Sequence, residues 1–411
     1  MRNIALATIY VFSLWTAAAW ASGPVKVMVF PLNGSSKNEA LAWLGEGIAI
    51  SLSNQLSGRG VEVINRVGRI ELVENLDLPP GGQLSRGSMI RVAQRGSVDL
   101  VVMGTYTGTE KNLKISVRVL DVQALKLSGE MSANGPLSAL PQMENELAWL
   151  ILTNTDLDRT SSREKFQERM RKIPNSAYAY YIMSLEATGE SEQIHLLLKA
   201  VETYRDFPDA QYQLGHLYFH RGDCVSAIPH LMLGKGEAKA QPENDFMLGT
   251  CYLQGDQSIQ AIQAFSRMLQ VSRPYEALNN LGVAYLRNGD NTPALNALLE
   301  AKNLARTDST VSLNLAIVRH LQGNDSAAHG ALEDAIKAHP KNGMLQFLLG
   351  VLLNMQGESD KASLATDKAK SLGINVEKLQ SEDPKMWSRI LLTWEGSKTF
   401  SGDSGTAAGT P

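Results

Sequence analysis

The 411-residue chain has little net charge, and this limits its partners. The formal net charge is -3 and no block of basic residues occurs, so nucleic acid and anionic membrane surfaces are not favoured as partners. No long low-complexity tract is present, and 44% of the residues are apolar, as in folded globular proteins. The length exceeds that of one ordinary core, so we expect two or three domains.

Only one stretch is apolar enough to suggest a membrane segment, and it lies at the N-terminus. Arg2 precedes the largely apolar residues 4–18, and Ala19-Trp20-Ala21 supplies a small-x-small cleavage site. We predict that residues 1–21 are a cleaved signal peptide and that the chain is exported, to the periplasm or beyond the cell. An uncleaved anchor is the alternative, because the stretch is nearly long enough to span a bilayer. No cysteine directly follows the apolar run, which argues against a lipid anchor.

The chain has only two cysteines, Cys224 and Cys251. An oxidising compartment would permit a disulfide, and the repeat described next places the two residues at neighbouring helix ends. The favoured interpretation is nevertheless a pair of unbridged, half-buried thiols, with the disulfide as the alternative.

A glycine-marked turn recurs every 33 or 34 residues through the second half of the chain. A small residue precedes most of these turns, an alanine follows most of them, and a proline closes most units. This pattern predicts two-helix hairpins, with small residues where the helices cross and proline ending the second helix. Each hairpin is apolar on both flanks and must stack on its neighbours. The turn glycines are Gly189, Gly222, Gly255, Gly289, Gly323 and Gly357.

Within these units Leu214-Gly215-x-x-Tyr218, Leu248-Gly249-x-x-Tyr252 and Leu281-Gly282-x-x-Tyr285 share one pattern, and Ala261-x-x-x-Phe265 supplies a second. Residues 174–373 therefore resemble the tetratricopeptide repeat (TPR) family, in six units. The resemblance implies an all-α, right-handed solenoid whose concave face, lined by the first helix of each unit, holds a protein or peptide partner.

The residues expected on that concave face form a candidate peptide-binding groove. Gln213, Asn280 and Asn314 share one phase of the repeat, where some TPR relatives carry an asparagine ladder that bonds the backbone of an extended peptide; Met247 and Leu348 interrupt it. The favoured interpretation is that these amides bond neighbouring turns, and the ladder is the alternative. The candidate groove residues are Tyr212, Gln213, His216, Phe219, His220, Phe246, Asn279, Asn280, Val283, Arg287, Leu313, Asn314, Ile317 and Phe347.

The hydrophobic pattern of residues 24–153 predicts an α/β domain with a mixed sheet and flanking helices. Residues 25–30 and 100–106 are apolar runs typical of buried strands, residues 113–119 alternate as an edge strand does, and residues 39–56 have helical spacing. The motifs Val27-Met28-Val29-Phe30-Pro31-Leu32 and Asp99-Leu100-Val101-Val102-Met103-Gly104 resemble the N-terminal domain of TolB-like proteins, including CsgG- and FlgO-type proteins. The resemblance implies a non-catalytic interaction module of the cell envelope.

No catalytic constellation stands out, and we expect no enzyme activity, cofactor or metal. His216 and His220 have a spacing that can hold a metal, but no third ligand is evident and we interpret them as groove or surface residues. Gly34, Gly45 and Gly47 do not match a phosphate loop. Ser35 and Ser36 lack a base.

The sequence thus predicts an exported, non-enzymatic protein-binding scaffold of the cell envelope. A helical linker is expected at 154–173, a capping helix at 374–396 in which Trp387 and Trp394 cover the last hairpin, and a disordered tail at 397–411. Two alternatives stay open: an oligomeric subunit or assembly factor of an envelope secretion machine, associating through the N-terminal domain, and an enzyme regulated by its repeats. A buried acid/base pair in a deep N-terminal pocket would favour the enzyme.

Overall fold

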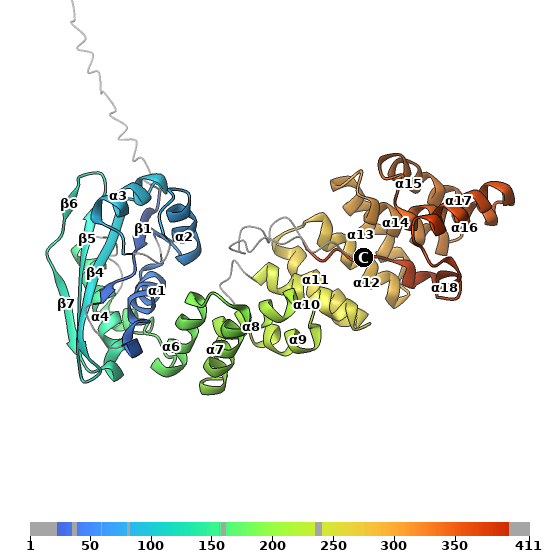
Figure 1. Cartoon of the computed structure of the whole chain (residues 1–411). Helices are drawn as coiled ribbons and strands as arrows, with labels where there is room; N and C mark the ends of the chain where they lie inside the picture. Colours follow the sequence, from blue (N-terminus) through green and yellow to red (C-terminus); the bar gives the residue numbers. More distant parts are fainter. Residues whose placement is uncertain are drawn as a thin grey trace, which may run out of the picture. The chain divides into compact units, whose positions relative to one another are not determined.

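The computed structural model describes residues 23–34, 39–58, 60–79, 83–155, 157, 162–234 and 241–393 (Figure 1). The chain divides into two compact units, residues 1–171 and 172–411. The predicted signal peptide at 1–21, Ser35 and Ser36, Trp394, the predicted tail at 397–411 and part of the expected linker lie outside the described residues. Among the residues described, none of the helices combines the length and apolar character needed to cross a membrane.

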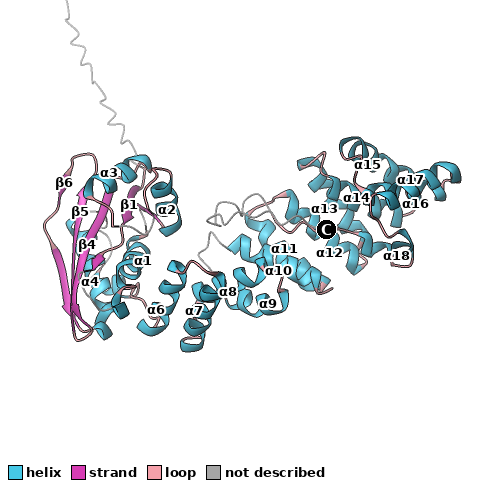
Figure 2. Ribbon diagram, in the orientation of Figure 1, coloured by secondary structure: helices cyan, strands magenta, loops and turns pink. Residues whose placement is uncertain are grey.

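The first unit is built on a mixed sheet of seven strands, shown in magenta in Figure 2. The main order is β3-β1-β4-β5-β6, with β2 beside β4 and β7 beside β5. The pairs among β1, β2, β3 and β4 are parallel, whereas β5 runs antiparallel to β4, β6 and β7. The strands are β1 Val25–Val29, β2 Asn33–Gly34, β3 Val61–Ile64, β4 Leu100–Thr109, β5 Asn112–Asp121, β6 Lys126–Leu127 and β7 Met131–Gly135.

Helices cover both faces of this sheet. Met28 and Phe30 pack with Val73 of α2 and Val92 of α3 on one face. Because side chains alternate along a strand, Val27 and Val29 point to the other face, where α1 packs on β1 and on α4. The helices of the unit are η1 Glu39–Leu41, α1 Leu44–Leu56, α2 Arg66–Glu74, α3 Arg86–Arg95, η2 Leu137–Ala139, α4 Leu140–Asn154 and α5 Arg163–Gln167. Of the linker helix expected over 154–173, only the short α5 is formed among the described residues.

The second unit is a series of six helical hairpins that pack in chain order (Figure 1). The first helix of each hairpin contacts the first helix of the next from α8 onward, so α8, α10, α12, α14 and α16 together form one face, which we call the A-helix face. The hairpins are α6 Asn175–Glu186 with α7 Glu190–Thr203, α8 Pro208–His220 with α9 Cys224–Leu233, α10 Gln241–Gln254 with α11 Ser258–Val271, α12 Tyr275–Asn288 with α13 Asn291–Leu304, α14 Ser309–Leu321 with α15 Asp325–Ala338, and α16 Gly343–Met355 with α17 Ser359–Ser371.

The regular spacing of the sequence pattern has two steric causes. At the turns, Gly222 has a φ of 75° and Gly289 a φ of 94°, a left-handed conformation that a side chain disfavours. At the helix crossings, a Cβ on Gly249 would lie 2.7 Å from the Phe265 ring, and one on Gly282 would lie 2.5 Å from Leu298. Glycine fits both positions, whereas even an alanine would force Phe265 or Leu298 to move.

The substitution Gly222→Ala is expected to lower the free energy of unfolding by about 1 kcal/mol, because nothing crowds the site and only the left-handed backbone opposes the change. Gly330→Ala is the matched control: Gly330 lies exposed within α15 with open space around it, so alanine there should stabilise the chain by about 0.5 kcal/mol. Denaturant titrations measure both. Equal effects of the two substitutions would contradict the assigned turn conformation.

Two expectations for this unit are corrected. Cys224 and Cys251 are joined by a disulfide, with Cα atoms 5.1 Å apart, because the start of α9 packs beside α10; the favoured prediction of free thiols was wrong. The capping helix expected at 374–396 is replaced by the five-residue helix α18 Val376–Gln380, a 3-10 turn η3 Pro384–Trp387 and a non-helical stretch to residue 393. Asp383 caps η3 by accepting the N–H of Lys385.

Candidate functional site

The C-terminal residues 384–391, which we call the docked segment, lie on the A-helix face. The turn η3 at its start packs against α12 and α14, and Figure 1 shows this red part of the chain turning back over these helices after α18. From Ser388 onward the segment is neither helix nor strand. Its backbone groups therefore need partners other than a helical or sheet ladder.

Two asparagines supply those partners. Asn314 of α14 donates Nδ2–H to the carbonyl of Arg389 at 2.7 Å and accepts the N–H of Arg389 at 2.9 Å. Asn280 of α12 does the same for Leu391, at 2.7 and 2.8 Å. Each amide thus satisfies both backbone groups of one residue, and successive repeats serve every second residue of the segment. These are the bonds of the asparagine ladder, not the bonds to neighbouring turns that we favoured from the sequence.

A third asparagine holds the two rungs in place. Asn279 accepts a bond from Asn314 at 2.8 Å, donates to Asn280 at 3.1 Å and donates to the carbonyl of Arg389 at 3.3 Å. All three side chains are completely buried. A buried amide network of this kind is stabilising only when its donors and acceptors are paired, and here the segment's backbone completes the pairing.

Side chains of the segment enter the apolar clusters of the repeats. Trp387 is 5% exposed and packs edge-on against Phe347, with ring centroids 5.0 Å apart, and parallel to His320 at 6.5 Å. Its indole N–H donates to the carbonyl of Leu379 at 2.8 Å. Ile390 packs against the cluster of the third and fourth hairpins.

Most predicted apolar groove residues belong to these same clusters. Leu313, Ile317 and Phe347 share a cluster with Trp387, whereas Phe246 and Val283 belong to the one that Ile390 covers. Phe246 also packs edge-on against Phe265 of α11. These side chains therefore form the floor beneath the docked segment and the interior of the hairpins, rather than an open groove.

A basic side chain closes the site beside the ladder. Arg287 of α12 donates Nε–H to the Ser388 hydroxyl at 3.3 Å and Nη1–H to the carbonyl of Leu253 at 2.9 Å. Burial lowers the pKa of Arg287, opposed by the charge of Asp256, yet a guanidinium stays charged in proteins. Arg287 thus ties the segment to two successive hairpins.

Three predicted groove residues of α8, Tyr212, His216 and His220, form a separate polar cluster with Glu243 of α10. The Tyr212 hydroxyl donates to Glu243 at 2.7 Å, and Nε2 of His216 lies 3.9 Å from the other Glu243 oxygen and 3.1 Å from Nε2 of His220. Burial, together with the charge of His220, lowers the pKa of His216 to about 3, so this imidazole is neutral at physiological pH. No group of three metal-ligating side chains that could hold an ion occurs among the residues described.

The ladder position is not filled by an amide in every hairpin. Met247 and Leu348 occupy it in α10 and α16, and both side chains are buried. Gln213 of α8 is half-buried, and its side chain has no hydrogen-bond partner among the described residues. Phe219, on the same helix, packs against the apolar cluster around Tyr212.

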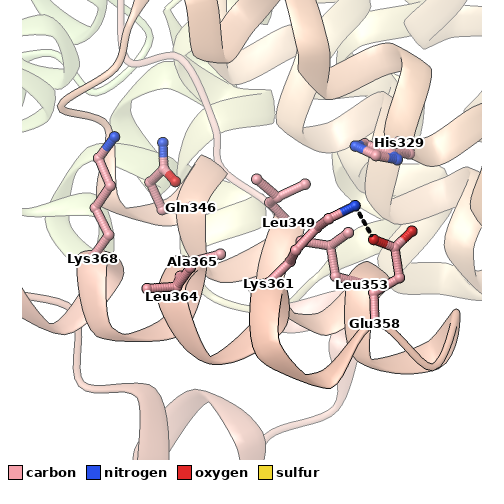
Figure 3. Close-up of a pocket in the computed structure, with 9 residues that line it drawn as sticks. All are labelled: His329, Gln346, Leu349, Leu353, Glu358, Lys361, Leu364, Ala365 and Lys368. Atoms are coloured by element: carbon pink, nitrogen blue, oxygen red, sulfur yellow. Dashed lines mark ion pairs between the residues drawn. The ribbon is translucent and has the colours of Figure 1, made fainter.

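Two shallow pockets lie away from the ladder. One of about 400 Å³ is formed by the last hairpin and α15, where Figure 3 shows the ion pair of Lys361 with Glu358 near Leu353. The other, of about 310 Å³, lies on the sheet of the first unit between Arg86, Arg118 and Glu130. Neither includes a residue of the ladder or of the docked segment.

Two buried carboxylates in the first unit form ion pairs with arginines. Glu46 pairs with Arg69, which also donates to the carbonyl of Val29 at 2.8 Å. Glu144 accepts from the Ser51 hydroxyl at 2.7 Å and pairs with Arg171 at 3.3 Å. None of these residues lines the pocket on the sheet, so the arrangement that would favour the enzyme alternative, an acid/base pair in a deep pocket, is not formed by them.

Glu144 should make the stability of the chain pH-dependent. Burial raises its pKa from the ordinary 4.5 to about 7, although Arg171 and Ser51 oppose the rise. The folded state therefore binds a proton that the unfolded state has released, and stability falls as pH rises from about 4.5 to about 7. The decline amounts to roughly 3 kcal/mol in the free energy of unfolding, and we expect Glu144→Gln to remove it.

Chemical unfolding at several pH values measures the effect. Glu146→Gln, on the same helix but at a partly exposed site, is the control and should leave the decline in place. Parallel stability curves for wild type and Glu144→Gln would show that the buried carboxyl does not titrate in this window.

The comparisons with known proteins concern the repeats. Residues 246–308 and 315–371 match the tetratricopeptide repeat family model. The chain contains TPR repeats. Solved structures similar to part of the chain include MamA, at 22% identity over 41% of this chain and 98% of MamA with a TM-score of 0.36. Another is YrrB, described as a TPR protein with an unusual peptide-binding site, at 15% identity over 45% of this chain and 98% of YrrB with a TM-score of 0.37. No curated protein matches the chain.

Sequence reasoning missed the docked segment itself. Ser388, Arg389 and Leu391 take part mainly through their backbones, which leave no mark on the residue pattern. The available signal was the apolar run Ile390-Leu391-Leu392, which lies beyond the last TPR unit and so needs a surface to cover it.

Proposed function

We propose that this chain is a non-enzymatic scaffold of the cell envelope that holds an extended protein or peptide segment on the A-helix face of its TPR repeats. The observation that carries the proposal is the two-rung ladder, in which Asn280 and Asn314 each bond both backbone groups of one residue. Side-chain amides that hydrogen-bond to backbone N–H and C=O groups hold an extended segment largely irrespective of its sequence. Stacked repeats of this kind present long surfaces for such partners.

Three features support the envelope as the location. Residues 1–21 have the pattern of an export signal. The disulfide between Cys224 and Cys251 suits an oxidising compartment. The motifs of the first unit resemble those of TolB-like envelope modules, and its mixed sheet with helices on both faces is compatible with such a module.

Affinity capture from envelope extract tests the proposal, with wild type compared with Asn280→Leu/Asn314→Leu. Leucine and methionine occupy the same position in two other hairpins, so side chains of this size fit there, and the cost of the change is the loss of the bonds of Asn279 to both amides. We expect the variant to keep its helical circular dichroism and to lose the captured partner. Capture of the same proteins in the same amounts by both forms would refute the proposed use of the ladder.

A further inference from the structure

The A-helix face already carries a ligand, and that ligand belongs to the same chain. The ladder, Arg287 and the apolar floor all contact residues 387–391. A partner segment that used the ladder would need the same donor and acceptor atoms of Asn280 and Asn314. The two cannot bind together.

We infer that the docked segment is a resident competitor, and that the partner is an extended segment of the same pattern: a large aromatic residue followed, three residues later, by a branched apolar residue. The inference rests on the proposed function, because it takes the ladder to be the binding site. It adds what the partner looks like and what it must displace.

The side-chain pattern follows from the two slots that the segment fills. Trp387 lies against Phe347 and His320, of α16 and α14. Three residues later, Ile390 covers the cluster that contains Val283 of α12. Between them, the Arg389 side chain bonds, among the described residues, to carbonyls of the segment's own residues and to the Met344 sulfur, so the pattern does not require arginine there.

The direction of the segment is also fixed. Trp387 packs at α16 and α14, Arg389 bonds α14 and Leu391 bonds α12. The segment therefore runs from later hairpins towards earlier ones, two residues per hairpin. An incoming segment must run the same way to place its aromatic residue in the Trp387 slot while both rungs bind.

Tethering makes the resident segment an effective competitor. Only a short connection separates α17, which ends at Ser371, from Pro384, so the segment is present at high effective concentration. The apparent affinity for a free segment equals the intrinsic affinity multiplied by the fraction of molecules whose own segment is undocked.

The test uses a fluorescent synthetic peptide with the sequence of residues 384–393 and measures its binding to the full mature chain by anisotropy. Two variants open the face in different ways: Trp387→Ala/Ile390→Ala weakens the resident side chains, and Leu391→Pro removes the N–H that donates to Asn280. We expect each to bind the peptide at least about tenfold more tightly than wild type does. Asn280→Leu/Asn314→Leu, added to either, should abolish binding, and a peptide with alanine at the Trp387 and Ile390 positions should bind at least about tenfold more weakly.

The outcomes separate the two proposals. Equal affinity of wild type and both opened variants would overturn the resident competitor and leave the ladder's function standing. Equal binding of the native and the alanine peptide would overturn the side-chain pattern. If no peptide binds the opened variants while envelope partners still depend on the ladder, this inference is wrong and the proposed function holds. If capture of envelope partners does not depend on the ladder either, both this inference and the proposed function are wrong.

Discussion

Trp387→Ala is expected to release the docked segment from the A-helix face. Removal of a buried tryptophan side chain costs about 3–5 kcal/mol, and this loss falls on a short segment otherwise held by bonds to the three asparagines, by Arg287 and by the packing of Ile390. The segment can detach without unfolding the hairpins. The substitution can therefore lower the free energy of global unfolding by no more than the free energy of docking. The main consequence is therefore local.

Limited trypsin digestion with mass spectrometry measures this release, because Arg389 is half-buried in the docked state. We expect cleavage after Arg389 to be slow in wild type and to accelerate about a hundredfold or more in Trp387→Ala, as about 3 kcal/mol implies. Trp387→Phe keeps an aromatic ring but lacks the N–H that donates to Leu379, and it should give an intermediate rate. Unchanged cleavage in Trp387→Ala would mean that the tryptophan does not hold the segment.

Loss of the disulfide should give the second large effect. The bridge joins residues 27 apart in the sequence, and closure of a loop of this length stabilises the folded state by about 3.5 kcal/mol in the chain-entropy model. Cys224→Ala/Cys251→Ala should therefore lower the melting temperature by about 10 °C. The hairpins α8/α9 and α10/α11, which the bridge connects, should lose protection first.

Reduced wild-type protein provides the control for this prediction. Wild type in reductant should melt like the double variant, and the double variant should not respond to reductant. A melting temperature of wild type that is the same with and without reductant would show that the bridge adds nothing to stability.

The sequence was sufficient for the hairpins because their requirements are local. A left-handed turn at Gly222 and a close helix crossing at Gly249 each require a particular residue at one position. Because each hairpin has the same turn and crossing, these residues recur as a periodic sequence pattern. The same reasoning found the phase of Asn280 and Asn314. The mixed sheet was also visible, since the buried β1 and the alternating β5 differ in pattern.

What the sequence could not show depends on long-range geometry. The repeat spacing places Cys224 and Cys251 at neighbouring helix ends, but the 5.1 Å between their Cα atoms is set by the packing of α9 on α10. The ladder's ligand is bonded through the backbones of Arg389 and Leu391, about 75 and 111 residues from their partners. The expected capping helix failed for the same reason: the segment gains more from the A-helix face than from its own helical bonds.

Hydrogen exchange at the amides of Arg389 and Leu391 tests the central claim, that the asparagine ladder holds an extended segment by its backbone. In wild type both amides should exchange slowly, because Asn314 and Asn280 accept their hydrogens in a buried setting. In Asn280→Leu/Asn314→Leu they should exchange at the rate of an unstructured peptide while the amides of α12 and α14 stay protected. Fast exchange at both positions in wild type, or protection that survives in the double variant, would contradict the account.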